Sequence, residues 1–243
     1  DEAGRSVLHD RLFTPGELLR QNQLAPDAAA LTEMETGRQL QLFELLSQSP
    51  LFIAPIVEGK VEVEAVPKLL HRLYRQDPRP GLLVVNPAIR VKSGSFLNDD
   101  AYFRRYVELG ARKAQAQPRG SVLILLDCED DAPCKLGPAL LERARRVRPE
   151  TRFTVILAHR EYETWFLAAA PSLRSLCGLP ADLEAPANPA AIRGAKQWLA
   201  ARMPAGYDPP NHQPLFTEHF SFDLAAGVPS FARLQRKARN LFA

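Results

Sequence analysis

Four short apolar runs, each followed by a segment with helical periodicity, constrain this chain more than any other feature. The runs span Leu51–Val57, Leu82–Val91, Ser121–Leu126 and Phe153–Ala158. Runs of this length are typical of buried strands, and their alternation with helices is typical of a parallel sheet covered on both faces. We therefore predict an α/β fold of the Rossmann-like class, with a mainly parallel sheet of about four strands and helices on both faces.

The segments between the runs carry the signals of individual helices. After the first run, Val66, Leu69 and Leu73 repeat at the spacing of one helix face. Later in the chain, Asp99 or Asp100 is placed to cap a helix. Right-handed crossovers then bring the carboxyl ends of all the strands to one edge of the sheet, which is where open α/β sheets bind ligands.

Three regions of the chain differ in composition. Residues 1–50 show no strand pattern and are expected to form a helical N-terminal extension, whereas residues 51–170 hold the alternation of strands and helices. Within the latter, the apolar segment Thr164–Ala170 predicts a further helix that Pro171 stops. Residues 171–243 are rich in proline and are expected to form an irregular, mainly helical C-terminal cap.

Charge is nearly balanced overall but unevenly distributed. The 243 residues include 31 Lys and Arg against 28 Asp and Glu, a surplus too small to establish an anionic partner. Basic residues concentrate in Arg143–Arg152 and in Phe231–Asn240. Such patches can follow phosphates, although a solvated helix face is the commoner role of each patch taken alone.

Cysteine use and hydropathy indicate a cytoplasmic protein with no membrane partner. Cys128, Cys134 and Cys177 form no Cys-x-x-Cys pair, so neither a disulfide framework nor a structural zinc site is expected. No apolar run approaches the roughly 20 residues needed to span a bilayer. The first residues, Asp1–Asp10, lack the basic and then apolar profile of a signal peptide.

Pairs of acids follow three of the predicted strands. They are Glu58 and Glu62, Asp127 and Glu129, and Glu161 and Glu163. Carboxylates brought together repel one another and either take up protons or bind a hard cation. Since magnesium prefers oxygen ligands and leaves positions for substrate phosphate, these acids predict a site for one or two Mg²⁺ or Mn²⁺ ions and metal-assisted phosphoryl chemistry. For any single acid, capping of the next helix or a bond to loop amides is an equally good explanation.

Basic residues near the same edge are candidates for contacting a substrate phosphate. They are Lys60, Lys92, His159 and Arg160. Lys60 is a candidate for stabilising developing negative charge, and the amides of the turn Lys92–Ser95 for wrapping a phosphate. An ordinary loop position is the alternative for each. The chain has no GxSxG nucleophile elbow, so serine hydrolase chemistry is set aside.

Two of these segments carry a family resemblance. The pattern VEGKVE at 57–62 and the later pattern ILLDCED at 124–130 resemble the TOPRIM fold of topoisomerases, primases and OLD-type nucleases. The segments AHREYETWFLAAA at 158–170 and PSFARLQRKARNL at 229–241 are similar to a group of small bacterial TOPRIM-like proteins, often found beside ATPases in mobile or antiphage loci. The resemblance covers residues 51–170 well and the tail loosely.

The resemblance implies roles for individual residues. Glu58 matches the TOPRIM glutamate, and Asp127 with Glu129 matches its Asp-x-Asp pair, with Glu in place of the second Asp. It implies a TOPRIM-like catalytic domain over residues 51–170, in which these three acids hold the metal and Lys60 and Glu161 assist catalysis.

The function implied is a Mg²⁺-dependent nuclease that cleaves DNA or RNA as the effector of an antiphage defence or toxin-like system. Its expected partners are nucleic acid, an ATPase or other defence-complex subunit, and a second copy of the chain in a homo-oligomer. Two alternatives stay open. The first is a non-catalytic TOPRIM scaffold that binds nucleic acid or an ATPase complex, and the second is a small-molecule phosphohydrolase of the doubly wound class.

Overall fold

The computed structural model describes residues 50–77 and 81–242, and these residues form an α/β fold. The strands are β1 (Leu51–Val57), β2 (Leu83–Val85), β3 (Ile89–Arg90), β4 (Arg119–Asp127) and β5 (Arg152–Ala158). The helices around the sheet are α3 (Glu62–Arg75), α4 (Ser93–Asn98), α5 (Asp100–Gln115) and α6 (Pro133–Val147). The C-terminal helices are α7 (Thr164–Ala168), α8 (Ala195–Ala200), α9 (Pro209–His219), α10 (Phe222–Ala225) and α11 (Pro229–Leu241). The predicted N-terminal extension falls on residues 1–49, outside the described residues.

The sheet is parallel, as the sequence predicts. Its strand order is β2-β1-β4-β5, with β3 also paired to β1, and every pairing is parallel. The single second strand predicted over Leu82–Val91 is wrong, because β2 and β3 are separate short strands with Pro87 between them. Proline has no backbone N–H to donate to a ladder, so the pairing breaks there.

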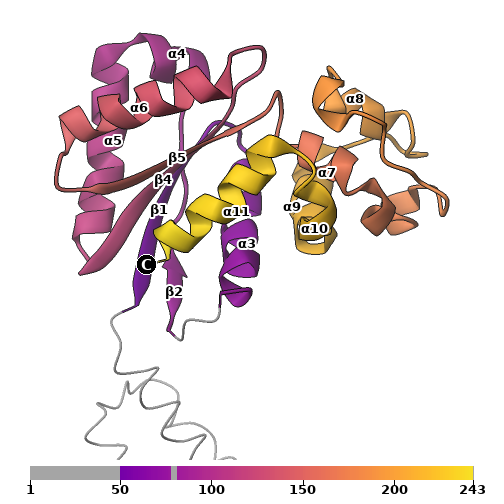
Figure 1. The fold of residues 1–243 in the computed structure, drawn as a ribbon, viewed down its shortest axis with the longest axis horizontal. Coiled ribbons are helices and arrows are strands. Elements are labelled where there is room, and N and C mark those ends of the chain that lie inside the picture. Colours follow the sequence, from indigo (N-terminus) through magenta and orange to yellow (C-terminus); the bar gives the residue numbers. More distant parts are fainter. Residues whose placement is uncertain (1–49, 78–80, 243) are drawn as a thin grey trace, which may run out of the picture. The chain divides into compact units, whose positions relative to one another are not determined.

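The two faces of the sheet bury different sets of side chains and form a three-layer structure. Along β1, Ile53 and Val57 pack with α3, whereas Ala54 and Ile56 pack with α5 on the opposite face. In Figure 1, α4, α5 and α6 cover one face, and α3 and α11 cover the other. Because both faces are buried, β1 and the centre of β4 are continuous apolar segments instead of alternating ones.

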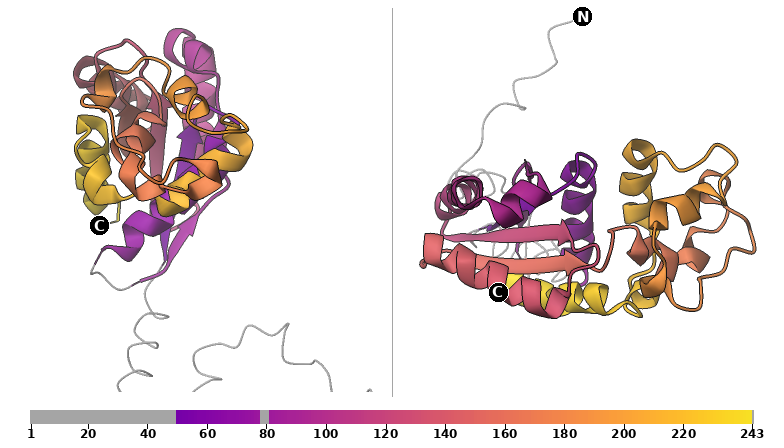
Figure 2. Two further views of the ribbon diagram at one scale, coloured as in Figure 1. Left: turned by 90° about the vertical axis from the view of Figure 1, so that its right-hand side faces the viewer. Right: turned by 90° about the horizontal axis from the view of Figure 1, so that it is seen from above.

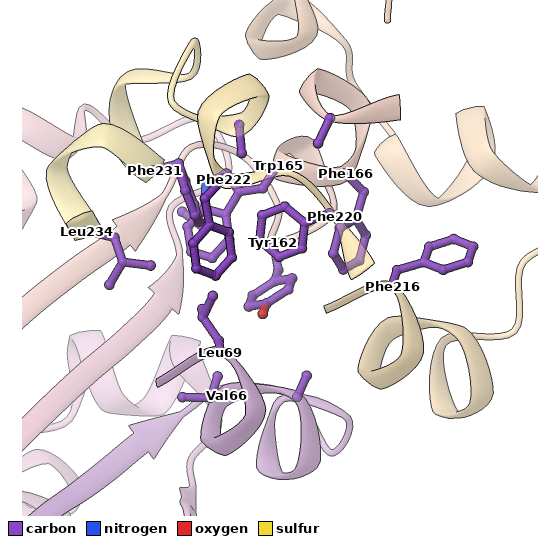
Figure 3. Close-up of a cluster of buried hydrophobic side chains, with 14 of the residues drawn as sticks. Val66, Leu69, Tyr162, Trp165, Phe166, Phe216, Phe220, Phe222, Phe231 and Leu234 are labelled. Carbon is purple, nitrogen blue, oxygen red and sulfur yellow. The ribbon is translucent and has the colours of Figure 1, made fainter. Parts of the chain in front are cut away.

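The chain beyond α7 shares the core of the sheet. Aromatic rings from α7, α9, α10, α11 and the residues next to them gather above α3 and bury one another (Figure 3). They include Tyr162, Trp165, Phe166, Phe216, Phe220, Phe222 and Phe231. The polar atoms among them are paired, since Trp165 Nε1 donates to Ser230 Oγ at 2.9 Å and Tyr162 Oη lies 3.1 Å from Thr217 Oγ1. This packing is what holds the C-terminal segment against the strand ends.

The predicted stop at Pro171 is wrong in detail. Helix α7 already ends at Ala168, and Pro171 lies inside a 3₁₀ turn, Ala170–Leu173. Proline is compatible with the first positions of such a turn, because the N–H it lacks has no intrahelical partner there. The chain therefore bends at Ala169 and turns toward the aromatic core.

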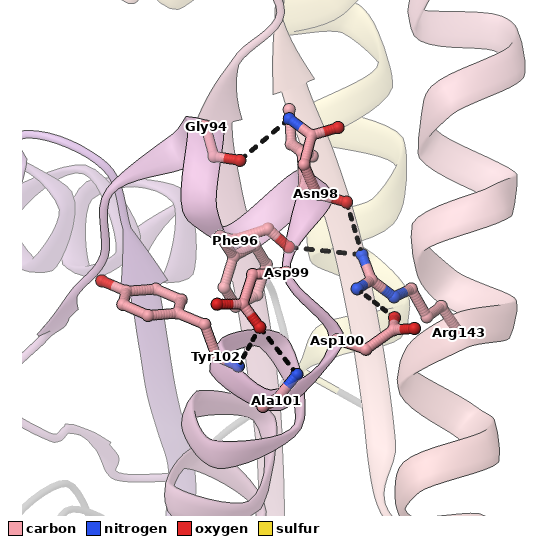
Figure 4. Close-up of polar contacts among 9 residues, drawn as sticks. Gly94, Phe96, Asn98, Asp99, Asp100, Ala101, Tyr102 and Arg143 are labelled. Carbon is pink, nitrogen blue, oxygen red and sulfur yellow. Dashed lines mark hydrogen bonds and ion pairs between the residues drawn. The ribbon is translucent and has the colours of Figure 1, made fainter.

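Arg143 of α6 ties down the connection between α4 and α5 (Figure 4). Its guanidinium donates to the carbonyl of Leu97 at 2.7 Å and pairs with Asp100 at 2.6 Å. It also lies 3.9 Å from the ring centroid of Phe103. Of the two predicted capping residues, Asp99 caps α5, since its side chain accepts from the backbone of the first turn.

The views in Figure 2 show α7 to α10 gathered beyond one end of the strands, while α11 returns along the sheet. None of the helices formed by residues 50–77 and 81–242 has the length and apolar character needed to cross a membrane. The end of the sheet that faces α7 is the carboxyl end of β1, β4 and β5, where the predicted site lies.

Candidate functional site

The carboxyl ends of three neighbouring strands lie side by side. The sheet register pairs Val57 of β1 with Leu125 of β4, and Asp127 of β4 with Ala158 of β5. Glu58 follows β1 directly, and Asp127 is the last residue of β4. The loops that carry the predicted acids therefore start from one edge of the sheet.

Glu58 is partly buried and its carboxylate is held from two sides. The Ser93 hydroxyl, in the first turn of α4, donates to Oε1 at 2.6 Å, and the backbone N–H of Asp127 also donates to the carboxylate. Burial raises the pKa of Glu58 above its ordinary value, against the effect of the Ser93 hydrogen bond. The charges of Glu62 and Glu129 raise the pKa further. The fold thus brings acids from β1, α3 and β4 together.

Asp127 lies deeper and is more strongly perturbed. Burial raises its pKa well above the ordinary value, and the charges of Glu163 and Glu62 raise it further. Lys196 opposes this rise but does not cancel it. A buried carboxyl group surrounded by other acids favours either a proton or an added cation.

Glu62 joins the same group from the first turn of α3. It is 8% exposed, and its Oε1 accepts from Gln213 Nε2 of α9 at 3.2 Å. Its Oε2 is buried without a hydrogen-bond partner. This oxygen lies against Gly59, where a side-chain Cβ would stand only 1.7 Å from it. Glycine at this position therefore makes room for the Glu62 carboxylate.

The acids that follow β5 have a cation of their own. Lys196 Nζ of α8 lies 3.0 Å from Glu161 Oε2 and 3.1 Å from Glu163 Oε2. The backbone N–H of Ala195 donates to the other oxygen of Glu161 at 3.2 Å, and Tyr207 Oη donates to Glu163 Oε1 at 3.3 Å. Glu161 and Glu163 are thus engaged within the protein.

The charge balance keeps Lys196 protonated. Its burial would lower the pKa, but the charges of Glu163 and two further carboxylates outweigh burial and raise the pKa above its ordinary value. Glu163 is completely buried, and burial raises its pKa although Lys196 opposes the rise. Lys196 therefore offsets only part of the cost of burying the Glu163 carboxyl group.

Sequence reasoning missed Lys196, Tyr207 and Gln213. All three come from the proline-rich region after residue 190, where no periodic pattern or motif points to the strand ends. Gln213 and Glu62 are 151 residues apart in the chain. Their approach depends on how the aromatic core folds the C-terminal segment back over α3.

Two of the residues predicted to contact phosphate, Lys60 and Lys92, lie at the protein surface. The backbone N–H of Lys92 donates to Tyr102 Oη at 3.1 Å. The segment Lys92–Ser95, whose amides were predicted to wrap a phosphate, forms the start of α4, because Ser93 is the first residue of this helix. Within this segment it is the Ser93 side chain that reaches the acids.

The other two candidates follow β5 and make internal contacts. His159 Nδ1 lies 3.8 Å from Cys128 Sγ. Arg160 Nη1 pairs with Asp130 at 2.6 Å, and Arg193 pairs with the second oxygen of the same carboxylate at 2.8 Å. Arg160 thus ties the loop after β5 to the loop after β4.

The same two loops contain left-handed residues that are not glycine. Glu129 has φ 46° and Arg160 has φ 62°, and such conformations cost about 1 kcal/mol or more each. A hydrogen bond of 3.1 Å from the Glu129 N–H to the Arg160 carbonyl joins them. Backbone strain of this kind concentrates at functional sites, and here it fixes where the Glu129 side chain begins.

Comparison with known families bears on the same region. A family model described as Domain of unknown function (DUF4276) matches residues 57–237, about three quarters of the chain. The chain belongs to the DUF4276 family. No match was found among the curated proteins or the solved structures. The DUF4276 match begins at the end of β1 and runs into α11, so it includes every acid described above and also Lys196, Tyr207 and Gln213.

In this DUF4276 protein the acids of β1 and β4 fit a hard divalent cation by their chemistry. Neither Glu58 nor Asp127 forms an ion pair within the described part of the chain, and Glu62 Oε2 is buried without a hydrogen-bond partner. In residues 50–77 and 81–242 no three His, Cys, Asp or Glu side chains already form a group that could hold a metal. Carboxylate oxygens are the ligands that Mg²⁺ prefers, so Glu58, Asp127 and Glu129 are the residues that would hold it.

Proposed function

We propose that this protein is a nuclease that uses Mg²⁺ or Mn²⁺ to hydrolyse phosphodiester bonds in DNA or RNA. Glu58, Asp127 and Glu129 would hold one or two ions at the carboxyl edge of the sheet. The observation that carries the proposal is the convergence of Glu58 and Asp127. Burial and the charges of neighbouring acids raise the pKa of both groups, and neither group has an ion-pair partner within the described residues.

A divalent ion in this position would activate a water molecule and stabilise the charge that develops on the phosphate. The protein's own contribution is to orient the ligands. Ser93 and the Asp127 N–H fix the Glu58 carboxylate, and Gln213 fixes Glu62. Lys60 is exposed on the loop that follows Glu58 and has the charge to meet a phosphate oxygen there.

The test is cleavage of labelled duplex DNA, single-stranded DNA and RNA by the purified protein with Mn²⁺ or Mg²⁺. Wild type is expected to cut at least one polymer, whereas Asp127→Asn and Glu58→Gln are expected to cut none. Asp182→Asn, which makes the same change at an exposed acid, is the matched control and should retain activity. Phosphate release from nucleotides without cleavage of any polymer would instead support a small-molecule phosphohydrolase.

The proposed cellular role rests on the resemblance of VEGKVE and ILLDCED to TOPRIM proteins. On that basis the protein is the cytoplasmic effector of an antiphage defence or toxin-like system, acts with an ATPase subunit and forms a homo-oligomer. Repeating the cleavage assay with the protein of the adjacent gene, if it is an ATPase, tests the partnership. Equal cleavage with and without ATP and that protein would argue against it.

A non-catalytic scaffold is the second candidate, and two observations favour it. Glu129 stands where the resembling motif has aspartate, and the side chains do not yet form a metal group within the described residues. Titration with Mn²⁺ separates the two functions. A nuclease should bind the ion in a manner lost in Glu58→Gln, whereas a scaffold should bind nucleic acid with no such dependence.

A further inference from the structure

A basic groove of about 650 Å³ lies between α6 and α11, along the edge of β5 that pairs with no other strand of residues 50–77 and 81–242. We call it the edge groove. Its charged lining residues are Arg145, Glu150, Arg152, Arg233, Arg236 and Lys237. Five of these six are basic, so the groove is a positive feature on a chain whose overall charge is only +3. The candidate metal site, in contrast, is acidic.

Three cations of α11 in the edge groove are available to a ligand. Within the described part of the chain, Arg233, Arg236 and Lys237 form no hydrogen bond or ion pair. Their spacing of three and four residues places them on one face of the helix. Arg236 and Lys237 are exposed. The remaining cations and Glu150 are different, since they are engaged with neighbouring groups in the protein, as in the 3.0 Å bond from Arg152 to the Asn240 carbonyl.

The groove is better suited to a ligand that contacts its basic side chains than to a peptide that adds a strand to β5. A free edge such as β5 can accept an added strand, but Arg233 reaches over this edge toward α6. Its Nη1 would lie 3.8 Å from a Cβ at Gly137, and the Leu157 side chain of β5 is equally close to that point. Charged groups placed over an edge oppose strand addition. An extended peptide is therefore the poorer fit.

The lining also argues against recognition of unstacked bases. Phe153 is the one aromatic residue among those that line the groove, and it is 9% exposed. Binding of single strands relies on aromatic side chains that stack with bases. A row of unpaired cations without such a platform suits contacts to phosphates, which carry no sequence information.

The position of α11 connects the groove to the strand ends. Ser230, in its first turn, is bonded to Trp165 of α7, and Asn240, in its last turn, accepts from Arg152 at the start of β5. The helix therefore runs the full length of β5, from the carboxyl edge with its acids to the opposite end of the sheet. A polyanion lying in the groove would pass close to the acids at one end.

We propose that the edge groove binds the phosphate backbone of a nucleic-acid duplex through Arg233, Arg236 and Lys237. The inference rests on the proposed function in one respect, namely that nucleic acid is the substrate, and it adds where the polymer is held. Binding is independent of sequence and sensitive to salt.

The experiment measures binding of labelled DNA and RNA duplexes by fluorescence anisotropy, in EDTA so that no cleavage occurs. The groove variant is R233Q/R236Q/K237Q. The matched control is R104Q/R105Q/R112Q, which removes three exposed arginines from a second surface, on α5. Each lost phosphate contact lowers the slope of log K against log salt by about 0.9. The groove variant is therefore expected to lose about 2.7 from the slope and at least about tenfold in affinity at about 0.1 M salt, while the control loses little.

Equal losses in the two variants would overturn the inference, because they would show a general charge effect. Unchanged binding in the groove variant would also overturn it. So would a wild type that binds a labelled acidic peptide in the groove and binds no duplex. If the triple variant has a lower melting temperature than wild type, the double variant R236Q/K237Q replaces it, because both of its side chains are exposed. The double variant is expected to lose about 1.8 from the slope of log K against log salt. Wild type that binds duplex through the groove but never cuts it would leave this inference standing and refute the nuclease proposal.

Discussion

The acids after β5 and the acids after β1 and β4 occupy the same edge of the sheet, but they are neutralised differently. Glu161 and Glu163 share the ammonium group of Lys196 at 3.0 and 3.1 Å. Glu58 is held only by hydrogen-bond donors, Ser93 and a backbone N–H, which orient the carboxylate without cancelling its charge. We call the half with Glu161, Glu163 and Lys196 the closed half, because its acids have an ion-pair partner in the protein. We call the half with Glu58 and Asp127 the open half, because these two acids form no ion pair within the described residues.

This difference separates stability from function within a single acidic cluster. A buried acid with an internal cation is expected to affect folding when either partner is changed. An acid with no internal cation is expected to affect ligand binding, and its neutralisation should relieve repulsion in the free protein. Sequence gives all six acids the same appearance, so only their surroundings distinguish them.

The largest effect is expected from neutralising the open half. Asp127→Asn removes a charge that a divalent ion would contact, so Mn²⁺ affinity and cleavage should each fall by more than about 100-fold, or about 2.7 kcal/mol. Isothermal titration with Mn²⁺ and the nuclease assay measure the two losses. Glu161→Gln, in the closed half, is the comparison variant. An equal loss in Glu161→Gln would erase the distinction between the halves.

The next effect is on stability, from removing the cation of the closed half. Lys196→Met leaves Glu163 buried without its counter-ion, which should lower the free energy of unfolding by about 2 kcal/mol. This figure lies below the 3–5 kcal/mol typical of broken buried pairs, because the Lys196 side chain is 38% exposed. Urea denaturation measures the loss. The double variant with Glu163→Gln should recover most of it, and failure to recover would mean that Lys196 acts through packing.

The pH dependence of stability sharpens the comparison. Burial raises the pKa of Asp127 above its ordinary 3.8 and that of Glu58 above 4.5. The stability that protonation of these groups gives is therefore complete below about pH 4 and is lost as pH rises through the raised values. Between about pH 5 and about pH 8, Asp127→Asn should lose less stability than wild type, because it has no carboxyl group to ionise at this position. Chemical denaturation at both pH values tests this. Parallel losses in the two proteins would show that Asp127 is not destabilised by burial.

The smallest effect concerns the turn that holds Glu62. In Gly59→Ala, the new Cβ would fall 1.7 Å from Glu62 Oε2, so the carboxylate must move and weaken its bond to Gln213. A loss of about 1 kcal/mol, or roughly fivefold in Mn²⁺ affinity, is expected. Gly94→Ala is the control, since a Cβ there meets nothing within 4 Å. If both variants bind Mn²⁺ like wild type, Glu62 has no part in the open half.

The sequence predicted β1, β4 and β5 well, because burial on both faces makes the central part of each of these strands a continuous apolar run. The edge on which the acids lie follows from the parallel direction of the strands, which places their carboxyl ends together. The split at Pro87 shows the limit of predicting strands from apolar segments. An apolar segment can continue through a proline, whereas the backbone hydrogen bonds between strands are interrupted there. Lys196 and Gln213 were beyond prediction because their positions depend on tertiary packing of rings such as Phe216 and Phe220, and no local pattern encodes which acid a distant lysine will meet.

Helix α11 has a consequence for how the chain reaches its folded state. It is the last element of the described chain, yet Leu234 and Leu241 belong to the same core as the first strand. During synthesis the α3 side of β5 must remain uncovered until α11 has left the ribosome, because nothing earlier in the described chain takes the place of α11. Chains cut short before Pro229 would expose this apolar surface and are candidates for aggregation and degradation. Completion of this core is therefore coupled to the synthesis of α11.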